Sequence, residues 1–297
     1  MRTARHEEFD ASGASGMPAG SFEFTNEDFV VISQILREAT GIHLLDSKAT
    51  LVYSRIAKRL RALGLASFSD YCRYIAQDAG ERQGMIEALT TNTTSFFREQ
   101  HHFDLLEREV LPPLVEAARR RQPVRLWSSA SSSGQEPYSI ALSLLKVAPD
   151  APRLDIRILA TDINTQMVAK GLAGDYSDED IGGLSQEHLS RYFKRGAGER
   201  GAVYTATPDL KALIRFRQLN LQDKWPMRVS FDVIFCRNVM IYFAQETQTA
   251  LWQRLAQQLQ PGGYLFIGHS ERVTGPCAAT LEQVGITAYR KRTERRP

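Results

Sequence analysis

Cysteine is scarce in this chain of 297 residues, and its three copies, Cys72, Cys236 and Cys277, lie far apart in the sequence. Such a set provides neither a disulfide framework nor the clustered thiolates of a metal site. No apolar run approaches the roughly 18 residues that a membrane-spanning helix requires. The first 20 residues also lack the apolar core of a secretory signal. We therefore expect a cytoplasmic protein with reduced thiols and without direct membrane insertion.

A strong excess of one charge is missing as well. Lys and Arg number 37 and Asp and Glu 34, which gives a formal net charge of +3. A balance this small does not indicate nucleic-acid binding unless the cations cluster. The hydrophobic share of 43% and the charged share of 24% are ordinary for a soluble globular protein. At roughly 150 residues per domain, the chain has room for about two domains.

The amino-terminal third of the chain is predicted to be helical. Residues 1–20, rich in Gly, Ser and Ala, predict a flexible tail. Over residues 21–95, apolar side chains recur at helical spacing in four segments, the first of which begins at a capping-box pair, Thr25 and Asp28. Gly41 and Gly64 follow the first two segments, as expected at helix ends. We predict an all-helical docking domain over residues 21–95.

From residue 96 to 297 the pattern changes to short apolar runs that alternate with helical segments. Continuous apolar strands in such an alternation predict an α/β domain with a mostly parallel sheet covered on both faces. One stretch, at about residues 177–213, breaks the alternation with a short helix, several glycines and the run VYTAT. We predict a small strand-containing insert there.

The second helical segment is unusually basic. It carries Arg55, Lys58, Arg59 and Arg61, with no acidic residue between Ala49 and Ser69. The first three lie at positions i, i+3 and i+4, which predicts one exposed cationic face. That face is either a solvated helix surface or a docking surface for an acidic partner, and the sequence leaves both open.

Polar residues follow the first two predicted strands of the α/β domain. The run VRLWSSASSSGQEPYSIAL predicts a strand, a turn of small residues and a helix. Its single glycine in the turn, Gly134, gives poor support for a phosphate-binding loop, and Glu136 favours a cationic ligand group. Asp162 ends the next strand, where a carboxylate accepts hydrogen bonds from both ribose hydroxyls or caps the following helix. Together these features suggest a nucleoside ligand without phosphate, of which S-adenosylmethionine is the common example.

Two further segments bring polar groups to the same sheet edge. FDVIFCRNVMIYF predicts a buried strand that ends in Arg237 and Asn238, with Tyr242 soon after, either as part of a reaction pocket or as a core aromatic. NTTSFFRE places Asn92, Thr94 and Arg98 between apolar helices, and a guanidinium there could form a bidentate pair with a carboxylate.

Taken together, these segments resemble the chemotaxis receptor methyltransferases, the CheR family. The resemblance rests on NTTSFFRE, WSSASSSGQEPYSIAL, ILATDIN, the RYFKRG insert, FCRNVMIYF and PGGYLFIGHSE, which follow the family's order and cover about residues 25–292. One departure is Gln135, where the family usually has a glutamate. The resemblance gives the ligand role to the next residue, Glu136, so we expect little effect.

The resemblance implies a Rossmann-like methyltransferase domain that uses S-adenosylmethionine and releases S-adenosylhomocysteine. The implied reaction is O-methylation of specific glutamates on the cytoplasmic helices of chemoreceptors, giving glutamyl methyl esters for sensory adaptation. The residues that would contact the cofactor are Asn92, Thr94, Arg98, Glu136, Asp162, Asn220, Leu221, Arg237 and Asn238. Within this set we assign Asp162 to the ribose, Glu136 and Arg98 to the methionine end, and Asn220 and Leu221 to the adenine. Arg98 and Tyr242 would be the catalytic residues, with Tyr242 beside the transfer path.

The resemblance also concerns partners. The basic second helix would meet the acidic receptor helices. The insert resembles a subdomain that in some members holds a pentapeptide at the receptor's carboxyl terminus, and the sequence does not decide whether it does so here.

Two other functions stay open. A nucleic-acid methyltransferase would use the same cofactor fold with the amino-terminal helices on DNA. The run RNVMIYF is unlike the N/D-P-P-Y-type pocket expected for base amino groups, and the net charge is small, so we expect no nucleic-acid partner. A regulator that binds the cofactor or its demethylated product without methyl transfer is the second, although retention of the whole motif set argues against it.

The adjacent His101 and His102 do not predict a metal site. Neighbouring residues of a helix point to different faces, and no set of Asp, Glu or Cys side chains completes the pair in the sequence. We expect no bound metal.

Overall fold

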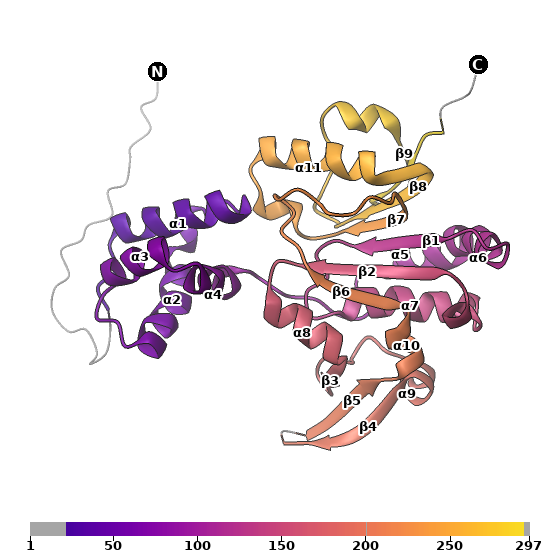
Figure 1. Ribbon diagram of the computed structural model, residues 1–297, viewed down its shortest axis with the longest axis horizontal. Coiled ribbons are helices and arrows are strands. Elements are labelled where there is room, and N and C mark those ends of the chain that lie inside the picture. Colours follow the sequence, from indigo (N-terminus) through magenta and orange to yellow (C-terminus); the bar gives the residue numbers. More distant parts are fainter. Residues whose placement is uncertain (1–21, 200, 294–297) are drawn as a thin grey trace.

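The computed structural model describes residues 22–199 and 201–293. The tail predicted for residues 1–20 lies outside these ranges. The chain forms a helical part at its amino-terminal end and a larger sheet-containing part, which lie side by side in Figure 1. No helix in the described ranges combines the length and apolarity that a bilayer crossing requires.

The first two helices of the helical part begin or end at the capping residues predicted from the sequence. Its elements are α1 (Asn26–Thr40), a single turn η1 (Asp46–Lys48), α2 (Ala49–Leu63), α3 (Phe68–Gln77) and α4 (Ala79–Leu89). The capping box of Thr25 and Asp28 is confirmed, and Gly41 and Gly64 end α1 and α2 with φ values of 76° and 67°. Their apolar stripes meet in one core around Ile32, Ile56 and other fully buried side chains. Burial of these stripes, rather than helix propensity, stabilises helices this short.

The central sheet has seven strands in the order β6-β2-β1-β7-β8-β10-β9. The strands are β1 (Val124–Ser128), β2 (Ile156–Asp162), β6 (Ile214–Gln218), β7 (Phe231–Cys236), β8 (Leu259–Ile267), β9 (Leu281–Gly285) and β10 (Ala288–Lys291). The first five pair in parallel, and β10 is antiparallel to β8 and β9. The mostly parallel sheet is confirmed. The edge strand β9 was not predicted, because most of its side chains are exposed and give no apolar run.

Both faces of the sheet are covered, as predicted. Alternation along β1 shows the two layers, because Leu126 belongs to the core under α6 and α7, whereas Trp127 belongs to the core under α11. The helices of this part are α5 (Gln100–Leu105), α6 (Leu111–Arg119), α7 (Gln135–Val147), α8 (Thr165–Ala173) and α11 (Gln245–Gln258). Short turns are η3 (Ala151–Arg153), η4 (Met240–Tyr242) and η5 (Pro276–Thr280).

The helix predicted after NTTSFFRE is interrupted. A π-helical stretch, η2 (Leu106–Val110), separates α5 from α6. Pro112 and Pro113 lie in the first turn of α6, one residue after this stretch, and cannot donate backbone N–H groups to the preceding turn. The change of hydrogen-bond pattern at this point is what such prolines impose on a helix.

A second, smaller sheet hangs from the crossover between α8 and β6 (Figure 1). Its elements are β3 (Asp175–Ser177), α9 (Gln186–Tyr192), β4 (Phe193–Gly198), β5 (Gly201–Ala206) and α10 (Pro208–Ala212). The three strands are antiparallel, in the order β3-β5-β4. Edge-to-face contacts of Phe96 with Tyr176 and Phe193 attach this sheet to the main body. The exact domain limits that we drew from the sequence stay predictions.

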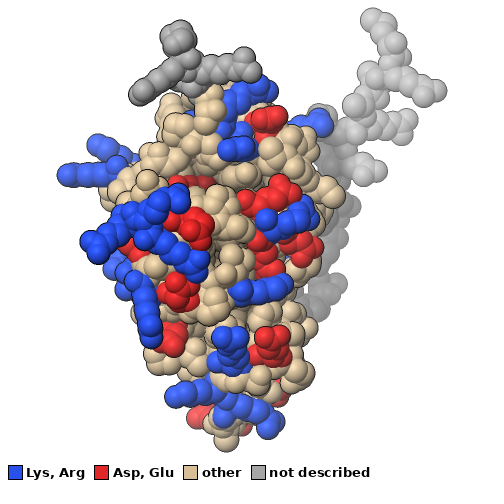
Figure 2. All heavy atoms as spheres, turned by 90° about the vertical axis from the view of Figure 1, so that its right-hand side faces the viewer, with Lys and Arg blue, Asp and Glu red and all other residues tan. Residues whose placement is uncertain are grey.

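Charges on the face shown in Figure 2 are mixed, with Lys and Arg side chains lying among Asp and Glu side chains. This distribution agrees with the small net charge. A face of this kind offers no single-sign field to a polyanion.

Candidate functional site

A cavity of about 550 Å³ lies between the helical part and the carboxyl ends of the parallel strands. Its volume is in the range of small-molecule sites, roughly 300–1,000 Å³. All ten residues predicted to bind the cofactor or take part in catalysis line it. They are Asn92, Thr94, Arg98, Glu136, Asp162, Asn220, Leu221, Arg237, Asn238 and Tyr242. Their roles stay predictions, but the structure brings these residues together.

The serine-rich turn after β1 packs against the end of β2. Ser132 has a φ of 47°, and its N–H donates to Asp162 Oδ2 at 2.8 Å while its hydroxyl donates to the Asn92 carbonyl at 2.8 Å. At Gly134, with a φ of 99°, a Cβ would come within 2.7 Å of the Tyr176 hydroxyl oxygen. The turn therefore requires glycine for its close approach to the neighbouring helix and sheet.

Asp162 does not cap the next helix. Asn164 fills that position, because its side chain accepts hydrogen bonds from the N–H groups of Gln166 and Met167. The Asp162 carboxylate instead accepts from the backbone N–H of Asn164 at 2.9 Å and lines the cavity. Burial raises the pKa of Asp162, and the backbone hydrogen bonds oppose that rise. Of the two interpretations of Asp162, the capping one is wrong.

Glu136 and Arg237 form a buried ion pair at the base of the cavity. Arg237 Nη1 lies 2.9 Å from Glu136 Oε2, and the Ser128 hydroxyl donates to Glu136 Oε1 at 2.7 Å. The Arg237 side chain is only 2% exposed and also donates to the Arg98 carbonyl. A guanidinium held in this way fixes the orientation of the carboxylate that faces the cavity.

Gln135, the departure from the family pattern, does not line the cavity. Its side-chain oxygen accepts a hydrogen bond from the Ser133 hydroxyl at 2.8 Å.

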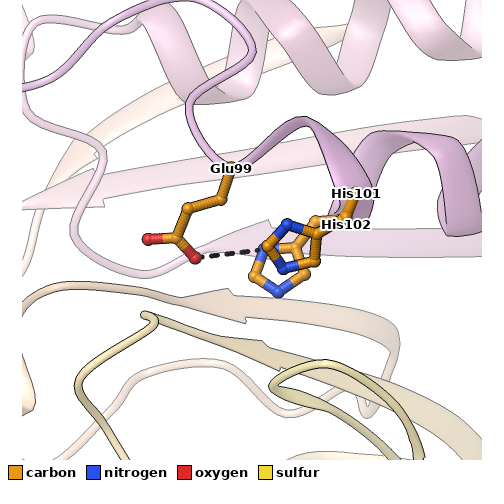
Figure 3. A group of neighbouring side chains, drawn as sticks. All are labelled: Glu99, His101 and His102. Atoms are coloured by element: carbon orange, nitrogen blue, oxygen red, sulfur yellow. Dashed lines mark ion pairs between the residues drawn. The ribbon is translucent and has the colours of Figure 1, made fainter.

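The structure corrects our reason for excluding a metal at the two histidines. Glu99 lies beside them, and one ligand atom from each of Glu99, His101 and His102 lies within 4.8 Å of the others (Figure 3). His102 Nδ1 is 3.6 Å from Glu99 Oε2. The sequence argument overlooked Glu99, whose left-handed backbone, with a φ of 59°, turns it toward the helix that follows.

Arg237 supplies a positive charge to this group. Its Nη2 lies 3.5 Å from the same Glu99 oxygen. Burial and the nearby Arg237 and His101 lower the pKa of His102 to about 3, so the ring is neutral at pH 7. Burial opposes ionisation of Glu99, but Arg237 and hydrogen bonds from His269 hold its pKa below the usual value. The positive charge of the guanidinium would oppose a metal cation at this group, and the expectation of no bound metal stays a prediction.

Sequence reasoning missed Glu271, which organises the loop after β7. Its buried carboxylate accepts hydrogen bonds from the backbone N–H groups of Asn238, Val239, Met240 and Gly268, at 2.6–3.1 Å. This loop carries Asn238, whose φ is 57°, and leads into Tyr242. Glu271 is the last residue of the PGGYLFIGHSE motif, so the motif marks its position, but the motif does not show which groups it contacts.

The segment between α1 and α2 was also missed, although it forms one wall of the cavity. Ile42 makes an antiparallel β-bridge with Phe243, and the His43 N–H donates to the Tyr242 carbonyl at 2.8 Å. Asn220 Nδ2 donates to the Ala39 carbonyl at 2.7 Å. The helical part is therefore hydrogen-bonded to the segments that carry two predicted site residues.

The prediction of an exposed cationic face on α2 is wrong for two of its three members, Arg55 and Arg59. Arg55 Nη1 donates to the carbonyls of Ala88 and Thr90, and Arg59 Nε donates to Glu81 Oε1 at 2.9 Å. Both side chains are directed to α4 and are partly buried. The third member of the face, Lys58, is exposed, as is Arg61, the remaining basic residue of the helix.

The residues of the cavity fit an adenosyl sulfonium better than a phosphate. The turn after β1 offers serines and a single glycine, and the carboxylates of Glu136 and Asp162 line the same space. Beside this turn the two carboxylates oppose a phosphate, whereas they suit an ammonium group and ribose hydroxyls.

Comparisons with known proteins agree with this geometry. Residues 27–90 match the family "CheR methyltransferase, all-alpha domain" and residues 92–289 match "CheR methyltransferase, SAM binding domain". A probable chemotaxis protein methyltransferase of Rhizobium etli is 46% identical over 86% of this chain and 96% of its own. Chemotaxis protein methyltransferase 2 of Pseudomonas aeruginosa is 41% identical over 90% of this chain and 94% of its own. The chemotaxis protein methyltransferase of Escherichia coli is 43% identical over 81% and 82%.

Proposed function

This chain belongs to the CheR methyltransferase family, and from that premise we propose that it methylates specific glutamate side chains on the cytoplasmic helices of chemoreceptors. It is an S-adenosylmethionine-dependent methyltransferase of chemotaxis. The receptor, the glutamate acceptor and the cytoplasmic location are the parts that we propose.

One observation carries the proposal. The ten residues predicted from the sequence come from five separate segments of the chain, and all of them line one cavity. Parallel strands bring their carboxyl ends to the same edge of a sheet, which is where ligands of open α/β folds bind. Arg98 lies at this cavity, so a positive charge is available for a carboxylate group.

We assign roles to the chain's own side chains. Asp162 would accept hydrogen bonds from the ribose hydroxyls, and Glu136, oriented by Arg237, would hold the amino group of the methionine end. Asn220 and Leu221 would flank the adenine. When bound, the cofactor supplies a methyl group on a positively charged sulfur, which a carboxylate oxygen can accept. Because a glutamate is already ionised at neutral pH, the site needs no strong general base.

The remaining task of the protein is alignment. Tyr242, in η4 at the cavity, would orient the acceptor through its hydroxyl, and Arg98 would fix a carboxylate at the methionine end. Side chains fixed around the reacting groups would take the place of solvent there and hold the groups in line.

The decisive experiment uses the full chain, cofactor with a labelled methyl group and the cytoplasmic fragment of a chemoreceptor from the same cell. We expect base-labile label on the receptor, mapped by mass spectrometry to glutamate side chains. The matched control is Asp162→Asn, which should bind the cofactor poorly and transfer little label. Label in DNA instead would support a nucleic-acid methyltransferase, and tight cofactor binding without transfer would support a regulator.

The insert gives a secondary proposal. The small sheet β3-β5-β4 would bind a peptide at the receptor's carboxyl terminus, as the family resemblance implies. Methylation rates of receptor fragments with and without their last five residues test this, because only a tethered enzyme should be slower on the shortened fragment.

A further inference from the structure

Two large apolar side chains are exposed at the mouth of the cavity. Leu45, which precedes η1, is 58% exposed, and Ile241, in η4, is 49% exposed. Both line the cavity described above. A partner that covers the entrance of this cavity would bury both side chains and remove their apolar surface from water.

The two side chains come from different parts of the fold but from segments that are hydrogen-bonded to each other. The bridge between Ile42 and Phe243 and the bond from His43 N–H to the Tyr242 carbonyl join these segments. Ile42 packs against the cores of both parts. The relative position of Leu45 and Ile241 is therefore fixed before any partner arrives.

The same entrance carries cations. Lys48 and Arg98 line the cavity, and within residues 22–199 and 201–293 neither forms an ion pair with a carboxylate. Lys48 is exposed, whereas Arg98, whose Nη1 donates to the Thr93 carbonyl, is the residue assigned above to the carboxylate of the cofactor. An acidic side chain that enters here meets positive charge inside an apolar rim.

We infer that Leu45 and Ile241 form a rim that contacts apolar side chains next to the target glutamate on an amphipathic, acidic partner helix. This inference rests on the proposed function and deepens it. In a helix, residues three and four positions from the glutamate lie on the same face, one turn above and below it. When the glutamate enters the cavity, those neighbours cover the rim. The rim therefore selects glutamates that have apolar residues at these positions.

The test compares neutral substitutions that remove apolar surface without adding charge. Leu45→Ser and Ile241→Ser should each lower kcat/KM for the receptor fragment about fivefold, and the double variant more than tenfold, because partner contact would bury each side chain. The Kd for S-adenosylmethionine, measured by calorimetry, should change less than twofold. Leu172→Ser is the matched control, because Leu172 is 65% exposed in α8 and does not line the cavity.

The outcomes separate this inference from the proposed function. If the unaltered chain transfers no methyl group to a receptor, the proposed function fails and the rim fails with it. If the unaltered chain methylates the receptor and the double variant matches Leu172→Ser in kcat/KM, only the rim is wrong. A second readout is a receptor fragment in which the apolar neighbours of one target glutamate are changed to serine: the unaltered enzyme should discriminate against it, and the double variant should not.

Discussion

Arg237 Nη1 lies 2.9 Å from Glu136 Oε2, although the two residues are 101 positions apart in the sequence. The pair joins the end of β7 to the first turn of α7, where solvent is nearly excluded. The guanidinium lies against the carboxylate that lines the cavity and pairs with its charge. Stability and cofactor binding therefore depend on the same contact.

The first prediction concerns that pair. Arg237→Met should lower the free energy of unfolding by about 3–5 kcal/mol, because it leaves a buried carboxylate without its partner. The double variant Glu136→Gln with Arg237→Met should lose less than the two single losses added together. Urea unfolding followed by circular dichroism measures both. A loss below about 1 kcal/mol for Arg237→Met would contradict the prediction.

Asp162→Asn should weaken the binding of S-adenosylmethionine about 10- to 100-fold, because charge-assisted hydrogen bonds to hydroxyls contribute about 1.5–3 kcal/mol each. Calorimetry with the cofactor and with its demethylated product should show equal losses, since both carry the same ribose. Asp209→Asn, at the start of α10 and away from the cavity, is the control. If Asp162→Asn bound S-adenosylmethionine with unchanged affinity, the assignment of Asp162 to the ribose would be rejected.

Tyr242→Phe should lower kcat about tenfold, the loss of one well-oriented hydrogen bond, while the Kd for the cofactor changes little. Single-turnover methylation and calorimetry on the same preparation give the two values. The opposite result, normal turnover with weaker cofactor binding, would move Tyr242 from the transfer path to the cofactor pocket.

His102 predicts a pH effect on stability. Its pKa is lowered to about 3 by burial and by Arg237 and His101, against about 6.5 in the unfolded chain. The contribution of neutral His102 to the free energy of unfolding is therefore fully present above pH 6.5. It is lost as the pH falls toward 3, at up to about 1.4 kcal/mol per pH unit. His102→Gln should show a flatter decline than the unaltered chain between pH 6.5 and 4. His43→Gln is the control, because the His43 side chain is exposed and lies outside the group formed by Glu99, His101 and His102, so this variant should follow the unaltered chain.

The division of the α2 cations is testable with a matched pair. Arg59→Met should lower the free energy of unfolding by about 1–3 kcal/mol, because Glu81 is buried and loses its ionic partner. Lys58→Met should change it by less than about 0.5 kcal/mol and should weaken receptor binding at low salt. If Lys58→Met left receptor affinity unchanged at every salt concentration, the docking role of this exposed lysine would be rejected.

Much of the fold and of the cavity could be predicted because the signals are local. Caps such as Thr25 and Gly64 fix helix ends within a few residues of sequence, and continuous apolar runs specify the parallel strands. Asp162 and Arg237 could be assigned to one site because parallel strands end at one edge. These inferences need only the spacing of apolar residues along the chain and the rule that parallel strands end at the same edge of a sheet.

What escaped prediction depends on contacts between distant segments. Arg59 looked unpaired because its partner, Glu81, lies on another helix. Glu99 lies beside His101 and His102 because its backbone is left-handed, a conformation that a glutamate in the sequence does not predict. Glu271 acts on backbone N–H groups, which every loop possesses, so no spacing of side chains reveals its role.

The bridge between Ile42 and Phe243 has a consequence for protein engineering. Exchanging the amino-terminal helices between relatives, to redirect an enzyme to other receptors, would also replace the residues that this part contributes to the cavity entrance. A working chimera should take residues 40–48 and 239–243 from the same parent, so that the contacts between these two segments are kept. Removing all residues before residue 92 would delete one wall of the cavity and open the cavity to bulk water.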